Sequence, residues 1–302
     1  MPRRLLATLT FLLLSVLATA SAAQERRFLG RGRLVTNDAF IGVMDRWQTG
    51  SVAASYVFGP AWTGTLPTRP GRMLEFRLHG QVIAPESLRR LRFSDRRYAN
   101  ALSAGLHTHY RLAGAEIAAG GDLTATGPQT GLYRIQDFLH DKLRITGSER
   151  ARLYEIRNGF YPGVVVEVGR PIDLGGAVHM RPFVEARQGA ETLVRGGVDL
   201  ILGQAERGLT LRDPVTGHRY RTIRAGDRGF SFVAGADYAY VAKSVFLPAP
   251  AYDPLERARL RAGIRWEGER LRLFYGATWL SREFAGQREG QVVGSLRIDY
   301  RF

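Results

Sequence analysis

Short segments in which apolar and polar residues alternate recur along the whole chain. The final segment, 291–302, shows the pattern most clearly, because every second residue from 296 onward is apolar and the residues between them are charged. Side chains of a β-strand point to opposite faces in turn, so this pattern predicts a strand with one apolar and one polar face. A transmembrane barrel needs apolar side chains toward lipid and polar ones inside. The chain is therefore predicted to be all-β, a transmembrane antiparallel β-barrel.

About twelve such segments can be delimited. They are 28–37, 47–58, 72–84, 98–112, 115–125, 158–169, 178–188, 193–203, 229–244, 258–267, 270–282 and 291–302. An even number of strands places both chain ends on one side, which is the periplasmic side in single-chain bacterial barrels. The odd connections then lie outside the cell: 38–46, 85–97, 126–157, 189–192, 245–257 and 283–290.

One connection on the periplasmic side, 204–228, is much longer than the short turns expected there. Two explanations remain open for it. Either the segment contains an additional hairpin, or the strand count is wrong by one pair.

The third outer connection contains a predicted short helix. Gly127-Pro128 opens it and Thr130 can cap it. Its apolar stripe consists of Leu132, Ile135, Leu139 and Leu143. Gln136 and His140 are four residues apart, so they share a helix face beside that stripe.

The amino terminus resembles a secretory signal peptide. Arg3 and Arg4 precede the apolar run 5–17, and small residues follow at 20–23. The run is short for a membrane-spanning helix, which needs about 20 apolar residues. We therefore expect a signal peptide at 1–22 and a single barrel enzyme domain at 23–302. Export then directs the chain to the bacterial outer membrane.

Composition narrows the possible chemistry. The chain has no cysteine, which excludes disulfides and thiolate metal sites. Its net charge is +15, and all of its basic residues except Lys142 and Lys243 are arginine. Export argues against nucleic acid as the partner. Arginine suits phosphate recognition, so phosphorylated lipid A of the outer leaflet is a plausible partner; arginine-rich codon usage is the alternative explanation.

Several residues able to support hydrolysis fall at the outer ends of strands. Asn37-Asp38 follows the first strand, and Arg46 and Thr49 begin the second. Together with Gln136 and His140 they would meet at one rim. Histidine is a suitable general base near neutral pH, and Asn and Asp oxygens are ligands that suit Ca²⁺.

Plainer interpretations of the same residues also exist. Asn37-Asp38 is often simply a turn. Asp45 and Arg46 could form an ion pair in the barrel mouth. His107 and His109 face one side of a strand; we interpret them as structural, with a metal pair as the alternative.

In combination the motifs resemble the outer-membrane lipid A 3'-O-deacylases. That family has Asn-Asp after the first strand, then Asp-Arg-x-x-Thr, Asp-Arg-Pro-Tyr/Phe-Ala, Gly-Pro, a Gln eight residues after that Pro, and a His four residues after the Gln. The matching positions here are Asn37, Asp38, Asp45, Arg46, Thr49, Asp95, Arg96, Tyr98, Ala99, Gly127, Pro128, Gln136 and His140. The chain differs at Arg97, where the family has Pro, and at Thr146, where it has an acidic residue.

The resemblance implies a twelve-stranded barrel that removes an acyloxyacyl chain from lipid A. It assigns His140 as the base that activates water, with Gln136 orienting the base or the substrate. Asn37, Asp38 and Thr49 would position the ester oxygen or Ca²⁺, with Asn37 and Asp38 as the metal ligands. The implied lipid A phosphate contacts are Arg46, Arg89, Arg90 and Arg92.

Two other functions were weighed. An outer-membrane phospholipase is also a twelve-stranded barrel that uses Ca²⁺, but it needs a Ser nucleophile near a strand His, and no such motif is found. A porin-like or structural barrel is the non-enzyme alternative. Finally, the aromatic residue Phe302 is expected to be recognised by the outer-membrane assembly machinery.

Overall fold

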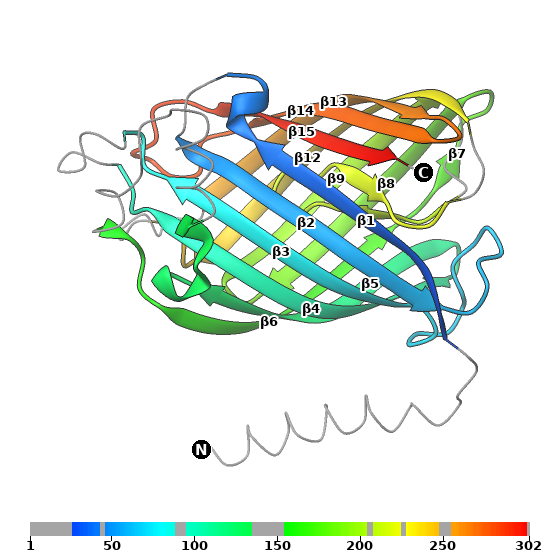
Figure 1. Cartoon of the computed structure of the whole chain (residues 1–302), viewed down its shortest axis with the longest axis horizontal. Coiled ribbons are helices and arrows are strands. Elements are labelled where there is room, and N and C mark those ends of the chain that lie inside the picture. Colours follow the sequence, from blue (N-terminus) through cyan, green and yellow to red (C-terminus); the bar gives the residue numbers. More distant parts are fainter. Residues whose placement is uncertain are drawn as a thin grey trace, which may run out of the picture.

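The structure is a computed structural model that describes residues 26–42, 46–87, 95–134, 154–203, 208–224, 228–247 and 255–300. In this described part, twelve long antiparallel strands form a closed barrel, because the first and last strands pair with each other. Figure 1 shows the barrel from the side, with the start of β1 and the end of β15 at the same end. The expected signal peptide 1–22 and Phe302 lie outside the described residues.

Every expected strand is present, with ends that differ from the prediction by no more than three residues. The wall strands are β1 (Arg27–Asn37), β2 (Trp47–Gly59), β3 (Leu74–Ala84), β4 (Ala99–Leu112), β5 (Ala115–Thr126), β6 (Gly159–Gly169), β8 (Val178–Gln188), β9 (Glu191–Gly203), β12 (Gly229–Ser244), β13 (Leu255–Glu267), β14 (Leu271–Leu280) and β15 (Gln291–Tyr300).

Side chains alternate across the wall as the pattern requires. In β2, Val52, Tyr56 and Phe58 are exposed on the outer face, whereas Ser51 and Ser55 are buried inside. The other wall strands likewise present large apolar side chains outward. An apolar outer surface with a polar interior is the arrangement of a transmembrane barrel.

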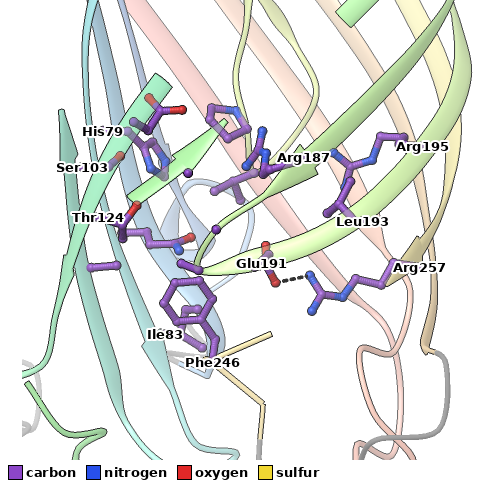
Figure 2. A pocket seen from close by; sticks show the side chains of 18 of the residues that line it. His79, Ile83, Ser103, Thr124, Arg187, Glu191, Leu193, Arg195, Phe246 and Arg257 are labelled. Atoms are coloured by element: carbon purple, nitrogen blue, oxygen red, sulfur yellow. Dashed lines mark ion pairs between the residues drawn. The ribbon is translucent and has the colours of Figure 1, made fainter. Parts of the chain in front are cut away.

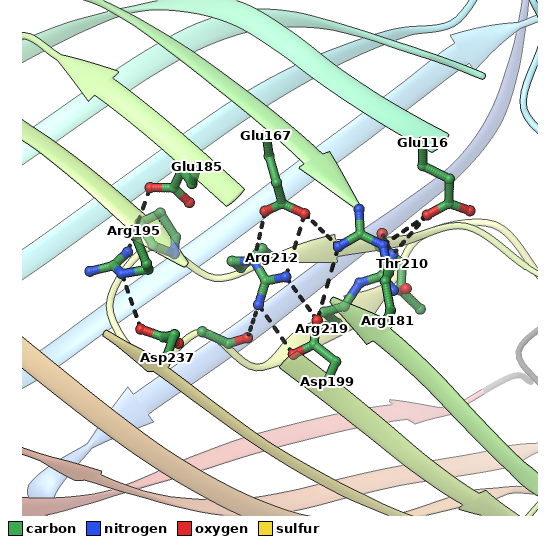
Figure 3. Close-up of polar contacts among 12 residues, drawn as sticks. Glu116, Glu167, Arg181, Glu185, Arg195, Asp199, Thr210, Arg212, Arg219 and Asp237 are labelled. Atoms are coloured by element: carbon green, nitrogen blue, oxygen red, sulfur yellow. Dashed lines mark hydrogen bonds and ion pairs between the residues drawn. The ribbon is translucent and has the colours of Figure 1, made fainter. Parts of the chain in front are cut away.

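The long connection 204–228 contains an additional hairpin rather than a miscounted strand pair. Its strands β10 (Thr210–Arg212) and β11 (Arg219–Arg221) pair only with each other. The hairpin folds back into the barrel, where nearly all of its described residues are at least partly buried. Arg212 donates to Glu167 of β6 at 2.6 Å and to Asp199 of β9 at 2.8 Å (Figure 3). The hairpin therefore fills the lumen near the end at which β1 begins.

The same hairpin lies along the inside of the barrel seam. β1 and β15 pair only where Val35–Asn37 meets Leu296–Gly294. Beyond that point, the guanidinium of Arg297 in β15 donates to the carbonyl of Arg221 at 2.6 Å. In β1, a Cβ added at Gly30 would lie 2.2 Å from the carbonyl oxygen of Thr222. A Cβ added at Gly32 would lie 2.5 Å from the carbonyl oxygen of Arg221. Glycine in β1 thus allows the hairpin backbone to approach the wall directly.

The remaining elements are short. They are the 3₁₀ turns η2 (Asp38–Phe40) and η4 (Pro128–Thr130) and the two-residue strand β7 (Ile172–Asp173). In the described ranges, no helix has the length and apolar character needed to cross a membrane. Of the expected loop helix only residues up to 134 are described; there, Thr130 Oγ1 accepts from the backbone N–H of Leu132 at 3.5 Å.

Candidate functional site

The Asn37-Asp38 pair forms a compact turn at the rim where β1 ends. Asn37 has extended backbone angles and caps η2, because its Oδ1 accepts from the backbone N–H of Ala39 at 2.8 Å. Asp38 is only 4% exposed, and its Oδ2 accepts from the backbone N–H of Arg46 at 3.3 Å. The turn interpretation and the ligand interpretation are therefore compatible: both side-chain oxygens are held in place by backbone donors.

This turn lies on the outer face of the barrel. Asn37 is two residues from Val35, which is 36% exposed on the outer face, so the two side chains share that face. Asn37 also pairs with Gly50, which is two residues before outward-facing Val52. A Cβ at Gly294 of β15 would lie 2.5 Å from Cβ of Phe40, so η2 covers β15 from outside (Figure 1). Tyr275, which is outward-facing on β14, donates to the carbonyl of Phe40 at 3.0 Å.

A second outer segment reaches the outside of the wall on the other side of β2. The Leu132 methyl groups lie 3.7 and 3.8 Å from where a Gly80 Cβ would project from β3. Gly80 faces outward, since its neighbour His79 is buried on the inner face. Segment 131–134 therefore begins to cover the outer surface of β3. The wall around β2 is thus flanked on its outer side by two connections.

Thr49 is the extra residue of a β-bulge in β2. The register with β3 shifts between Gln48 and Gly50, leaving Thr49 without a direct partner on β3. Its side chain is buried, and Oγ1 donates to the carbonyl of Trp47 at 3.5 Å. Trp47 itself has a positive φ of 51°, a rare conformation for a non-glycine residue. Bulges with unusual backbone angles are frequent next to active sites.

The Asp95-Arg96 motif holds the rim together. Asp95 accepts from the indole N–H of Trp47 at 2.7 Å and from the backbone N–H of Glu86 at 2.8 Å. Arg96 is buried and donates to Glu283 at 2.5 Å and to the carbonyl of Phe246 at 2.8 Å. Asp95 and Arg96 therefore link three outer connections and the start of β2.

Glu283 is the acidic partner in this rim contact. Burial alone would raise the pKa of its carboxyl, but the charges of Arg257 and Arg96 outweigh burial and lower the pKa below its usual value. Arg257 lies 3.4 Å from Glu283 and 3.0 Å from Glu191. Glu283 therefore stays ionised and ties the last outer connection to the ends of β4 and β13.

Arg46 is already engaged at the rim. Its guanidinium pairs with Glu289 at 2.7 Å and lies 4.3 Å from the centre of the Trp47 ring. The ion-pair interpretation thus holds for Arg46, with Glu289 as the partner. Asp45, the partner expected from the sequence, lies outside the described residues.

Five of the expected site residues lie outside the part of the chain that the structure describes. They are His140, Gln136, Arg89, Arg90 and Arg92. Their proximity to Asn37 therefore stays a prediction. The structure brings together Asn37, Asp38, Arg46 and Thr49 at one rim.

Asn37 and Asp38 suit a hard cation by donor type. Two carboxyl or amide oxygens on adjacent residues match the oxygen ligands that Ca²⁺ prefers, although Ca²⁺ takes six to eight of them. Among the described residues, no group of three or more His, Asp or Glu side chains is arranged to hold a metal. Any calcium site would therefore combine this pair with backbone oxygens, water, substrate or residues beyond the described ranges.

The two histidines weighed as a metal pair are instead separately bonded. Nε2 of His107 lies 3.0 Å from Asp122, and Nε2 of His109 lies 2.8 Å from Glu75. Both rings are buried among the charged groups of the lumen. The structural interpretation fits these contacts.

Sequence reasoning missed Asn100. The register places it in the same outward row as Asn37, through Gly50 and Val82. Asn100 is fully buried and donates to Glu155 at 3.0 Å, while its Oδ1 has no hydrogen-bond partner. Only the strand register could have indicated this position.

Comparisons with known proteins agree with this geometry. The family model described as outer membrane protein LpxR matches residues 5–302. Among solved structures, LpxR from Salmonella typhimurium matches with a TM-score of 0.66 and 16% identity, covering 90% of this chain and 100% of that one. Two other barrels are more distant. The KdgM porin matches with a TM-score of 0.39 and 6% identity, covering 90% of this chain and 99% of that one. The β domain of the Bordetella autotransporter BrkA matches with a TM-score of 0.42 and 13% identity, covering 90% of this chain and 99% of that one. No curated protein sequence matches significantly.

Proposed function

Because the chain belongs to the LpxR family of outer membrane proteins, we propose that it is a carboxylic ester hydrolase that deacylates lipid A. The bond cleaved is the ester that links the 3'-O acyloxyacyl chain to the sugar. The site faces the cell exterior, and the substrate is lipid A of the outer leaflet. A signal peptide at 1–22 and recognition of Phe302 by the assembly machinery would deliver the barrel there.

One observation carries the proposal furthest. Asn37 lies on the outer face of the wall, in line with outward-facing Val35, and the turn η2 that begins with Asp38 covers β15 from outside. A lipid ester can reach such a position while its acyl chains remain in the membrane. A site inside the barrel would require the lipid to leave the membrane first.

In this proposal each residue has a defined task. His140 removes a proton from the attacking water, and Gln136 orients His140 or the substrate. Asn37, Asp38 and Thr49 position the ester oxygen on which negative charge develops. The backbone donors from Ala39 and Arg46 fix the carboxyl and amide groups before substrate binds.

Calcium is the proposed cofactor, held by Asn37 and Asp38. When bound, such an ion polarises an ester carbonyl as a Lewis acid. Asn37 faces outward, where a lipid can approach along the wall, and Asp38 lies next to it in the buried base of the turn.

Phosphate recognition is assigned to arginine. Arg89, Arg90 and Arg92 are on one outer connection and would pair with lipid A phosphates. Arg46 would join them only by exchanging Glu289 for a phosphate, because its guanidinium is already paired.

The direct test is hydrolysis of purified lipid A by the barrel in detergent. We expect His140→Ala to lose at least about a hundredfold in rate, the usual contribution of a general base. Thr278→Val is the matched control, because Thr278 is buried on the inner face of β14, between outward-facing Tyr275 and Trp279, whereas Asn37 faces outward. Labelling by a serine-reactive probe with loss of activity would instead support the phospholipase alternative. Full activity of a folded His140→Ala barrel would overturn the proposed base.

A further inference from the structure

The lumen holds a cavity that the proposed deacylation does not use. Its floor includes Pro214 and Val215 at the tip of the β10–β11 hairpin, and its walls are β3 to β5 on one side and β8, β9 and β13 on the other (Figure 2). The empty space, including the open mouth, is about 1190 Å³. Because this volume counts the open mouth, it is an upper bound on the room for a ligand. Asn37 lies on the opposite, outer face of the wall.

One wall of this cavity is a patch of uncharged polar side chains. The strand register aligns His79, Ser103 and Thr124 across β3, β4 and β5 (Figure 2). Gln81 lies two residues farther along β3. The side chains of Gln81, Ser103 and Thr124 make no hydrogen bond to another described residue. His79 is only 8% exposed, and its Nε2 has no partner.

The charged side chains around the cavity are mostly basic. Of the described residues that line the cavity, five are arginines and three are carboxylates: Arg77, Arg187, Arg195, Arg257 and Arg259 against Asp122, Glu191 and Glu283. Arg187 extends toward the polar patch in Figure 2. One of its terminal nitrogens pairs with Glu185 at 3.1 Å, while its Nε has no hydrogen-bond partner.

Polar groups in such a place need partners. A buried donor or acceptor without one costs free energy, and an unsatisfied guanidinium N–H favours an anionic acceptor. Hydroxyl and amide groups next to that cation would in turn bind the hydroxyls of the same ligand. A bare inorganic anion would leave the polar patch unused, and a neutral sugar would leave Arg187 unused.

We propose that this lumenal cavity binds a sugar-sized anion with several hydroxyl groups, namely a sugar phosphate or sugar carboxylate. The anionic group contacts Arg187, and the hydroxyls contact His79, Gln81, Ser103 and Thr124. Phosphorylated saccharide headgroups of outer-membrane lipids and free sugar phosphates share this chemistry. The proposal does not depend on lipid A hydrolysis, because the two faces of the wall are separate.

The test is isothermal titration of the full barrel in detergent with glucose 6-phosphate, glucose and inorganic phosphate. We expect saturable binding of glucose 6-phosphate, at least about tenfold tighter than either fragment. Arg187→Met should weaken binding about tenfold or more, since hydrogen bonds to charged groups are the stronger kind. Thr124→Val should weaken it a few-fold, while its matched control Thr278→Val, which lies on β14 outside the cavity lining, should not.

Competition with lipopolysaccharide micelles identifies the source of the ligand. Displacement of glucose 6-phosphate would assign the cavity to lipid-linked saccharide, and retention would assign it to free sugar phosphates. The proposal is overturned if the wild type shows no saturable binding, or if Arg187→Met and Thr124→Val, both folded, bind as the wild type does. His140→Ala should bind normally, so failure of the proposed catalysis and failure of this site are distinguishable.

Discussion

Asp38 shows how a single residue can serve both fold and site. Its carboxylate is nearly buried in the turn that follows β1, where it accepts from the backbone N–H of Arg46. An amide at this position keeps an acceptor for that N–H but removes the negative charge. The substitution therefore separates a structural role from a role in catalysis or cation binding.

We expect Asp38→Asn to leave the barrel folded and heat-modifiable while lowering lipid A hydrolysis about a hundredfold, a typical effect of losing one electrostatic contact to the transition state. Activity assays with and without added Ca²⁺ would measure it. If the variant hydrolyses lipid A at the wild-type rate, Asp38 has a structural role alone.

Glu283 gives a prediction about pH. Arg257 and Arg96 lower its pKa in the folded barrel, so its ion pairs stabilise the rim above the pKa of an unfolded glutamate, about 4.3. That stabilisation is lost only as pH falls through the lowered pKa. We expect hydrogen exchange in segment 281–290, corrected for intrinsic rates, to stay slow at pH 5 and to rise well below pH 4.

Glu283→Gln supplies the comparison for that experiment. The amide cannot form the ion pairs with Arg96 and Arg257, so exchange in 281–290 should already be fast at pH 6. Equal protection of the wild type and Glu283→Gln at pH 6 would show that these ion pairs do not hold the connection.

At the scale of elements, the β10–β11 hairpin is the decisive feature. It occupies the lumen, pairs Arg212 with Glu167 and Asp199, and lies along the seam between β1 and β15 (Figures 1 and 3). Ser55 of β2 and Tyr220 of β11 hydrogen-bond at 2.8 Å through their hydroxyls. A lumen filled this way should conduct few ions.

We expect the wild-type barrel to show no stable open channel in planar bilayers, and a barrel lacking residues 208–224 to conduct. A second variant, Glu167→Gln with Asp199→Asn, leaves Arg212 without charged partners and should give intermittent openings if the deletion does not fold. Steady conductance by the wild type would contradict the plugged-lumen account and support the porin alternative.

The close approach of this hairpin to β1 can be tested with one methyl group. A Cβ at Gly32 would lie 2.5 Å from the carbonyl oxygen of Arg221, so Gly32→Ala must displace the hairpin. We expect a lower melting temperature and increased conductance. Gly196→Ala is the matched control, because a Cβ there meets nothing within 4 Å. Identical behaviour of the two variants would refute the tight seam contact.

At the scale of the whole molecule, the strands could be predicted because alternation along a strand is a local property. The fold class and all twelve wall strands followed from it. The hairpin could be recognised only as an anomaly in loop length, since its ion pairs join residues far apart in sequence. Likewise the polar cavity depends on strand register, which aligns His79 with Ser103 and Thr124 and leaves no trace in the sequence.

The candidate site was predictable in part for the same reason. Motif spacing identified Asn37, Asp38 and Thr49. The structure adds that Asn37 faces outward and caps a turn, and that Thr49 lies in a β-bulge. Asn100 was missed because only strand pairing places it in the same cross-strand row as Asn37, three strands along the wall. His140 and Gln136 stay predictions, since they lie outside the described residues.

The central claim is that this barrel deacylates lipid A through His140. The most direct test is mass spectrometry of lipid A from cells that express the wild type or His140→Ala at equal levels in the outer membrane. The account predicts loss of the mass of the 3'-linked acyloxyacyl chain in the wild type alone. Unchanged lipid A in cells with correctly inserted wild type, or the same loss in His140→Ala, would contradict it.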